Sequence, residues 1–262
     1  MWNKPQFMTV VADLLLLAGS AALLVAALSW GAHLPWFPLR EVVVVDRLQE
    51  IRRDDLELAL AGRLRGNFFS IELDEVRHAL QQLPWVRQVS VRRQWPSRLE
   101  VSIEEHVAAA HWRQGPEPET QDEEDDSGQL VNTYGEIFTA ALREPPAIPL
   151  PLLSGPPGLA PQILGYYQQA ADVLKTVGRM PHQIVVSPRL AVQVRLADGM
   201  LLELGRQQPE IPLRELLQRF VDYYPSVANA GKAPPEVVDM RYPNGFALRL
   251  AAASVSNNKG KP

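Results

Sequence analysis

Few residues of this chain have the types and the spacing that chemistry requires. His106 and His111 are the closest pair among its five histidines, and histidine pairs can hold a metal ion. On one extended strand, however, their separation would place the two rings on opposite faces. We therefore expect surface histidines and no metal site.

The other candidates for chemistry are Glu104 with Glu105, as an acid–base pair, and Ser154, as a nucleophile. Adjacent carboxylates on a strand point apart, and Ser154 lies in "LLSGPPG", which lacks the glycine that precedes the serine of a nucleophile elbow. The chain has no cysteine, no phosphate-binding glycine loop and no His-Glu-x-x-His motif. We expect no catalytic, cofactor-binding or metal-binding residue, and a protein that is not an enzyme.

The composition of the chain limits how many domains it can form and which kinds of partner it can bind. The chain has 262 residues, of which 46% are hydrophobic and 21% charged, enough for an apolar core and two small domains. Its formal net charge of -4 provides no overall positive field of the kind that attracts nucleic acid. We therefore expect no nucleic-acid partner.

Residues 12–34 are apolar enough to cross a membrane as one helix, and aromatic residues bracket them. A cleaved signal peptide is the alternative, but the apolar run is longer than the core of a typical signal sequence. More positive charge follows the segment than precedes it, which taken alone would favour the opposite orientation. Because the leading segment is so short, we still expect a cytoplasmic N-terminus over residues 1–11 and an exported remainder.

Residues 38–106 read as a compact α+β domain. The pattern predicts a buried strand over 41–46, helices over 54–62 and 73–80, and a hairpin that turns at Trp95. Asp74 is expected to cap the second helix. In the hairpin, one face carries the apolar residues Val89, Val91, Trp95, Leu99, Val101 and Ile103. The β-α-α-β-β order predicts a three-stranded sheet with both helices on one face.

Residues 107–250 read as a second, mostly antiparallel β domain with two helices. The predicted helices cover 161–178 and 212–224, the second ending before Pro225. The predicted hairpins are 129–139, 191–205 with an Asp-Gly turn, and 237–250 with its turn at Asn244 and Gly245.

Two polar segments accompany this domain. Residues 115–129 hold seven acids and read as a solvated loop, with a partner-binding acidic segment as the alternative. Residues 251–262 are expected to be a flexible tail.

The last hairpin is the best candidate for a binding site. A terminal strand leaves backbone groups unpaired, and a partner segment can add there as a further strand. Tyr242 and Phe246 would anchor such a partner, although both could instead cap the core.

Several stretches resemble the FtsQ/DivIB family of bacterial cell-division proteins. "GNFFSIELDEVRHALQQLPWVRQVSVRRQWPSRLEVSIEEHVAAAHW" (66–112) is similar to the POTRA domain of that family. "LVNTYGEIF", "LELGR", "RFVDYYP" and "VVDMRYPNGFALR" follow in the order of its C-terminal β domain. The acidic 117–126 insertion matches nothing in the family pattern.

The resemblance implies a single-pass type II protein of the inner membrane, with its bulk in the periplasm, that acts as a scaffold at the division septum. The expected partners are FtsB and FtsL, bound by strand addition at the last β strand, with FtsK, FtsW, FtsI and FtsN as neighbours. Carried over by motif, the partner-binding residues are Arg206, Phe220, Arg241, Tyr242, Asn244, Gly245, Phe246, Leu248 and Leu250. The POTRA hairpin arginines Arg87, Arg92 and Arg93 are the expected recruitment surface.

A transport role is the rival interpretation, because POTRA domains also precede outer-membrane barrels. Such barrels need many strands of about ten residues. Too little chain follows residue 107 for that, and two of its segments read as helices. An enzyme of cell-wall synthesis is the third alternative.

Overall fold

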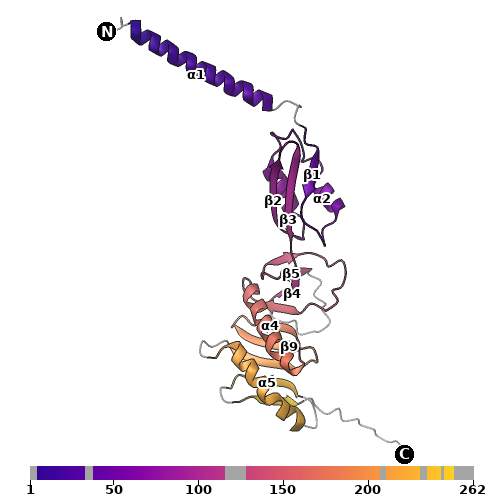
Figure 1. Cartoon of the computed structure of the whole chain (residues 1–262). Helices are drawn as coiled ribbons and strands as arrows, with labels where there is room; N and C mark the ends of the chain where they lie inside the picture. Colours follow the sequence, from indigo (N-terminus) through magenta and orange to yellow (C-terminus); the bar gives the residue numbers. More distant parts are fainter. Residues whose placement is uncertain are drawn as a thin grey trace, which may run out of the picture. The chain divides into compact units, whose positions relative to one another are not determined.

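A computed structural model of the chain describes residues 5–32, 38–115, 128–206, 211–230, 235–242 and 245–250 (Figure 1). The chain divides into two compact units, residues 1–105 and 106–262. The first contains an apolar helix and a small α+β domain, and the second is rich in strands, so the predicted α+β class is confirmed.

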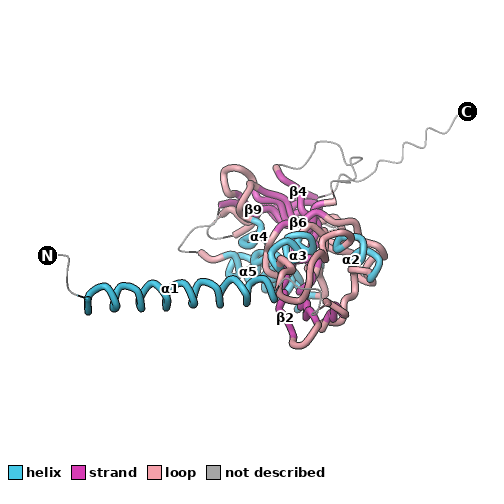
Figure 2. Tube along the Cα trace, turned by 90° about the horizontal axis from the view of Figure 1, so that it is seen from above, coloured by secondary structure: helices cyan, strands magenta, loops and turns pink. Residues whose placement is uncertain are grey.

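Helix α1 (Pro5–Ala32) is a single continuous helix of 28 residues (Figure 2). Its window Thr9–Ala27 has a mean hydropathy of 2.3, and none of it is buried against the rest of the chain. By length and composition it can cross a membrane. The helix begins before the span predicted at 12–34, whose last two residues lie outside the described residues.

The α+β domain of the first unit has the order predicted from the sequence. Its elements are β1 (Glu41–Val44), α2 (Arg53–Leu60), α3 (Leu73–Gln81), β2 (Val86–Gln94) and β3 (Arg98–Glu105). The strand order is β1-β3-β2, with β1 parallel and β2 antiparallel to β3. Figure 1 shows β3 between its two neighbours.

Alternation of apolar residues determines which face of this sheet is buried. Leu99, Val101 and Ile103 of β3 are at most 3% exposed, and they share the core with Val76 and Leu80 of α3. Val89 lies opposite Ile103 and Val91 opposite Val101, so these residues share one face, as predicted.

Three local predictions in this unit are wrong. Strand β1 is half-buried instead of buried, because it lies at the edge of the sheet. Trp95 is 68% exposed at the turn and does not join the apolar face. Helix α3 takes Glu72 as its N-cap, and Asp74, already inside the first turn, pairs with Arg77 at 2.6 Å.

Within the described residues, the second unit is built on one sheet of nine strands. The strands are β4 (Ala108–Gln114), β5 (Gln129–Asn132), β6 (Ile137–Thr139), β7 (Leu152–Gly155), β8 (Pro181–Val186), β9 (Ala191–Leu196), β10 (Leu201–Arg206), β11 (Pro235–Asp239) and β12 (Ala247–Leu250). Their order is β12-β11-β10-β9-β8-β7-β4-β5-β6. Most pairs are antiparallel, and the parallel ones are β4 with β7, β7 with β8 and β10 with β11.

Two helices cover this sheet and bury its core (Figure 2). Helix α4 (Ala160–Leu174) packs on β7, β8 and helix α5 (Leu213–Ala230). Its end continues as a short 3-10 turn, η1 (Lys175–Val177), which Gly178 closes in the left-handed conformation. The shared core includes Trp112, Ile163, Leu202 and Phe220, each at most 1% exposed.

The structure corrects two predictions in this unit. Strands β4, β7 and β8 were not predicted, and Ser154, first considered as a nucleophile, lies buried in β7. The predicted end of a helix before Pro225 is wrong, because α5 continues through this proline to Ala230. Proline cannot donate the hydrogen bond to the carbonyl four residues earlier, yet the helix tolerates the loss.

Candidate partner-binding edge

Strand β12 forms one end of the nine-stranded sheet. It pairs antiparallel with β11 through Val238 with Leu248 and Asp239 with Ala247, and within the described residues no strand lies on its other side. All four of its residues are exposed. An antiparallel strand with one neighbour directs alternate N–H and C=O groups outward, so this edge can accept another strand.

The two faces of β12 differ in chemistry. Leu248, 37% exposed, shares a face with Val238, which is part of the core, and Leu250, 50% exposed, continues that face. The apolar face of the sheet therefore reaches its edge only partly covered. On the other face, Arg249 lies 4.0 Å from Glu236.

Aromatic side chains extend the apolar face that Leu248 and Leu250 form at this edge. Phe246 packs against the core, with its ring centroid 6.5 Å from that of Tyr223 in α5. Tyr242 is 55% exposed and Tyr223 is 58% exposed. Tyrosine and phenylalanine at this exposure suit a protein interface, because they bury a large area with little loss of side-chain freedom.

Arg241 lies across the end of β10 and is held by acids. Its Nε and Nη2 donate to Oδ1 and Oδ2 of Asp239 at 2.8 and 2.5 Å, and Nη2 is 3.5 Å from Glu203. Gly205, with φ of +70°, makes room for it, because a Cβ there would lie 2.9 Å from Cγ of Arg241. Arg241 is therefore a fixed, half-exposed cation beside the edge.

The hydrogen bonds from Arg241 lower the pKa of Asp239, and the same bonds raise the pKa of Arg241. Asp239→Asn is therefore expected to destabilise the second unit at neutral pH. Because the folded pKa of Asp239 lies below its unfolded value, its contribution is complete above about pH 4 and is lost as pH falls through the folded pKa. Unfolding of parent and variant between pH 7 and pH 2.5 should show stabilities that converge only at the acidic end. A constant difference would contradict the pairing.

A shallow hollow of about 120 Å³ lies next to this cation. Its walls are formed by Leu204, Arg206, Ile211, Leu216, Met240, Arg241 and Tyr242. Arg206, the last residue of β10, is exposed at its rim. Arg219 of α5 reaches the backbone oxygen of Tyr242 at 3.5 Å and so ties the helix to the start of the last hairpin.

The predicted partner-binding residues are thus grouped at one end of the sheet, with two qualifications. Phe220 is 0% exposed and 4.9 Å from the ring of Tyr224, so it supports the edge from within the core and cannot touch a partner. Asn244 lies outside the described residues. Gly245, immediately before Phe246, is half-buried.

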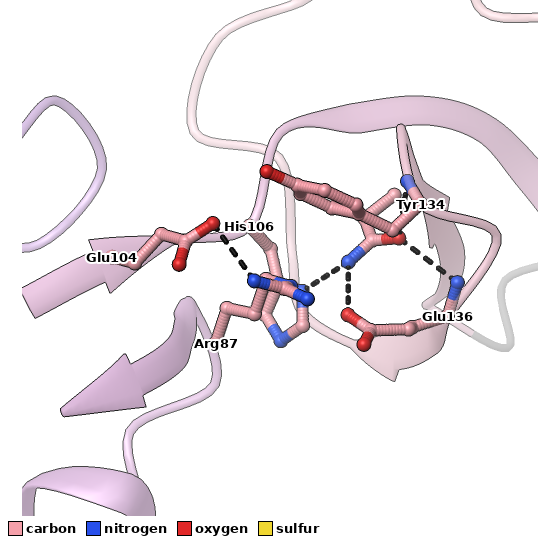
Figure 3. Close-up of polar contacts among 6 residues, drawn as sticks. Arg87, Glu104, His106, Tyr134 and Glu136 are labelled. Atoms are coloured by element: carbon pink, nitrogen blue, oxygen red, sulfur yellow. Dashed lines mark hydrogen bonds and ion pairs between the residues drawn. The ribbon is translucent and has the colours of Figure 1, made fainter.

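The three hairpin arginines of the first unit have separate roles. Arg87 pairs with Glu104 at 2.8 Å (Figure 3), and Arg92, whose side chain is 72% exposed, pairs with Glu100 at 2.5 Å. Arg93 instead donates to backbone oxygens of the loop before α3. The acceptors are Phe68, Phe69 and Ile71, at 2.9, 3.3 and 2.7 Å. Arg93 is therefore a structural residue more than a free surface charge.

Arg93→Ala is expected to destabilise the first unit by about 1–2 kcal/mol, because three loop carbonyls lose a charged donor at once. Amide hydrogen exchange of β2 and β3 would measure this loss. Arg92→Ala is the matched control and should leave exchange unchanged, since an exposed ion pair contributes little. Equal behaviour of the two variants would refute the structural role of Arg93.

The residues first considered for chemistry are held in structural contacts. Asn132, 0% exposed, accepts from the backbone of Tyr134 and Glu136 at 2.9 Å each (Figure 3). Its Nδ2 donates to Glu136 at 2.7 Å and lies 2.9 Å from Nδ1 of His106. The ring of His106 also stacks on Phe138, with centroids 4.2 Å apart. His106 thus packs on the hairpin of β5 and β6 and is not the surface histidine expected.

The other two candidates are equally engaged. The carboxylate of Glu105 accepts from the backbone of Gln49, Glu50 and Ile51 at 2.7 to 3.0 Å. The hydroxyl of Ser154 donates to the carbonyl of Gly115 at 2.5 Å. Across the described ranges, no three histidine, cysteine or acidic residues gather as metal ligands would.

Comparison with known proteins agrees with this architecture. Residues 37–106 match the family model described as POTRA domain, FtsQ-type, and residues 121–241 match that of cell division protein FtsQ/DivIB, C-terminal. The second match ends before β12.

Relatives named cell division protein FtsQ cover that strand too. The chain is 35% identical to the one from Burkholderia pseudomallei, over all of both chains. It is 33% identical to that of Bordetella pertussis, over 100% of this chain and 98% of the relative. For Nitrosospira multiformis the identity is 34%, over 95% and 99%.

Proposed function

The chain belongs to the FtsQ/DivIB family of cell-division proteins, and from this premise we propose that it is a scaffold that binds the FtsB/FtsL complex by strand addition at β12. Its apolar N-terminal helix and its family fit a membrane-anchored protein of the division septum. Family membership also implies interactions with other division proteins.

The open edge of β12 is the observation that carries the proposal. The sheet has two ends, and β6 at the other end has only three residues. Strand β12 has four exposed residues, of which Leu248 and Leu250 offer a partly uncovered apolar face. A partner strand on β12 would gain backbone hydrogen bonds and would cover these leucines at the same time.

The surroundings of β12 support specificity for the partner. Tyr242 and Phe246 supply aromatic contact area, and Arg206 at the rim of the hollow suits a charge-assisted bond to an acid of the partner. Arg241 would contribute less new binding, because Asp239 already engages its guanidinium.

We further propose an orientation in the membrane and a set of neighbouring division proteins. The N-terminus would lie in the cytoplasm and both folded units in the periplasm, which is the orientation that the resemblance to the family implies. The POTRA domain would then serve recruitment among FtsK, FtsW, FtsI and FtsN, with Arg92 as its exposed cation. The protein would hold these components together without catalysing a reaction.

Site-specific photo-crosslinking tests this function. A photoreactive amino acid is placed in turn at residues 246–250 and, as the matched set, at 137–139 of β6. In dividing cells, crosslinks to FtsB are expected from the β12 set alone. Crosslinks from β6 alone, or from neither strand while FtsB still co-purifies, would overturn the proposal.

A further inference from the structure

Helix α1 carries one polar stripe along its apolar surface. Within residues 9–27, whose side chains the structure describes, the polar residues are Thr9, Asp13 and Ser20, and every other one is Leu, Val, Ala or Gly. Separations of four and seven residues place these three on one face of a helix, and Ala27 follows seven residues later on the same face.

Asp13 is the residue of this stripe that needs a partner. The hydroxyl of Ser20 donates to the carbonyl of Leu17 at 2.9 Å, so it is satisfied within its own helix. Asp13 makes no hydrogen bond or ion pair with any residue in the described part of the chain. It lies four residues inside the window that begins at Thr9, about 6 Å along the helix axis.

No part of the window is buried against the rest of the chain, so the stripe faces lipid or another membrane protein. A carboxylate in hydrocarbon is strongly unfavourable unless it pairs with a cation or a donor, and such residues commonly mark helix contacts. A second copy of this chain would bring two carboxylates together at the same depth. The charge therefore selects a different occupant.

We propose that the stripe of Thr9, Asp13 and Ser20 is a second interaction surface, which binds a membrane helix of another protein with an arginine or lysine at the depth of Asp13. Small residues at 20 and 27 allow that helix to approach closely. This surface is separate from β12, so either can fail without the other.

Disulfide crosslinking in lipid vesicles tests the surface, because the chain has no native cysteine. Leu16→Cys places a thiol beside the stripe, and Ala18→Cys places one on the opposite face as the control. The full chain is reconstituted with a Leu/Ala membrane peptide that carries one cysteine and one arginine at the depth of Asp13, or with the same peptide in which leucine replaces that arginine.

Leu16→Cys should crosslink the arginine peptide at least threefold more than the leucine peptide, and Ala18→Cys should show no preference. Adding Asp13→Asn should remove the preference of Leu16→Cys. Equal yields with both peptides, or a preference that survives Asp13→Asn, would overturn the proposal. Crosslinks between two copies of the chain that exceed those to the arginine peptide would overturn it in favour of self-association.

Discussion

Proline at the position of β12 whose N–H faces the open edge is expected to lower affinity for the FtsB/FtsL complex at least a hundredfold without unfolding the second unit. Leu248 and Arg249 are adjacent, and adjacent N–H groups of an antiparallel strand point to opposite sides. One of them therefore faces β11 and the other faces the open edge. Proline is tolerated in an edge strand where the N–H points to solvent.

The experiment compares Leu248→Pro with Arg249→Pro. The variant whose N–H faces outward should keep the melting temperature of the parent and lose the partner, because that hydrogen bond and the approach of a partner strand are both blocked. The other variant should lose stability as well. Binding by the purified proteins, measured by calorimetry, separates the two. If both variants keep parental affinity, the partner does not add to β12.

Phe220→Ala is expected to destabilise the second unit by about 3–5 kcal/mol, the usual result of removing a buried aromatic ring from a core. Phe220 is 0% exposed and belongs to the cluster that joins α5 to the sheet. Chemical unfolding followed by the fluorescence of Trp112, which is buried in the same core, would measure the loss.

Tyr223→Ala is the matched control, since Tyr223 is the third residue after Phe220 and 58% exposed. It should cost less than about 1 kcal/mol of stability but weaken partner binding, because the exposed ring flanks Phe246. A Phe220→Ala variant as stable as Tyr223→Ala would contradict the supporting role assigned to Phe220.

Local patterns explain why much of the fold could be predicted from the sequence. The hairpin of β9 and β10 combines strict alternation with an Asp-Gly turn, in which Gly199 has φ of +90°. The POTRA hairpin is similarly determined by apolar residues that alternate with polar ones. Both pairings join neighbouring segments, so a short window contains the whole signal.

Two of the three missed strands, β4 and β7, take parallel partners, whereas β8 also forms a local hairpin with β9. Strand β4 pairs in parallel with β7, and β7 with β8, so none of these pairings joins the two arms of a local hairpin. The sequence of β4 is rich in alanine, and β7 has only four residues, so neither has a strong strand pattern. Their place in the sheet comes from tertiary packing, which a local pattern does not contain.

The candidate binding site, too, could be predicted from the sequence only in part. That the last hairpin ends the sheet, with Tyr242 exposed, could be anticipated from its place in the chain and its residue types. That Arg93 is held by carbonyls more than twenty residues away could not, because alternation indicates the face of an arginine and not its acceptors. Likewise, the burial of Phe220 becomes clear only once α5 is packed on the sheet.

Amide hydrogen exchange along β12 tests the central claim most directly. In the free protein, the outward amides of residues 247–250 should exchange rapidly, whereas those of β7 in the interior of the sheet should be protected. Adding the FtsB/FtsL complex should slow exchange in residues 247–250 at least tenfold and leave β6 unchanged. Saturating partner binding with no added protection in residues 247–250 would contradict strand addition at this edge.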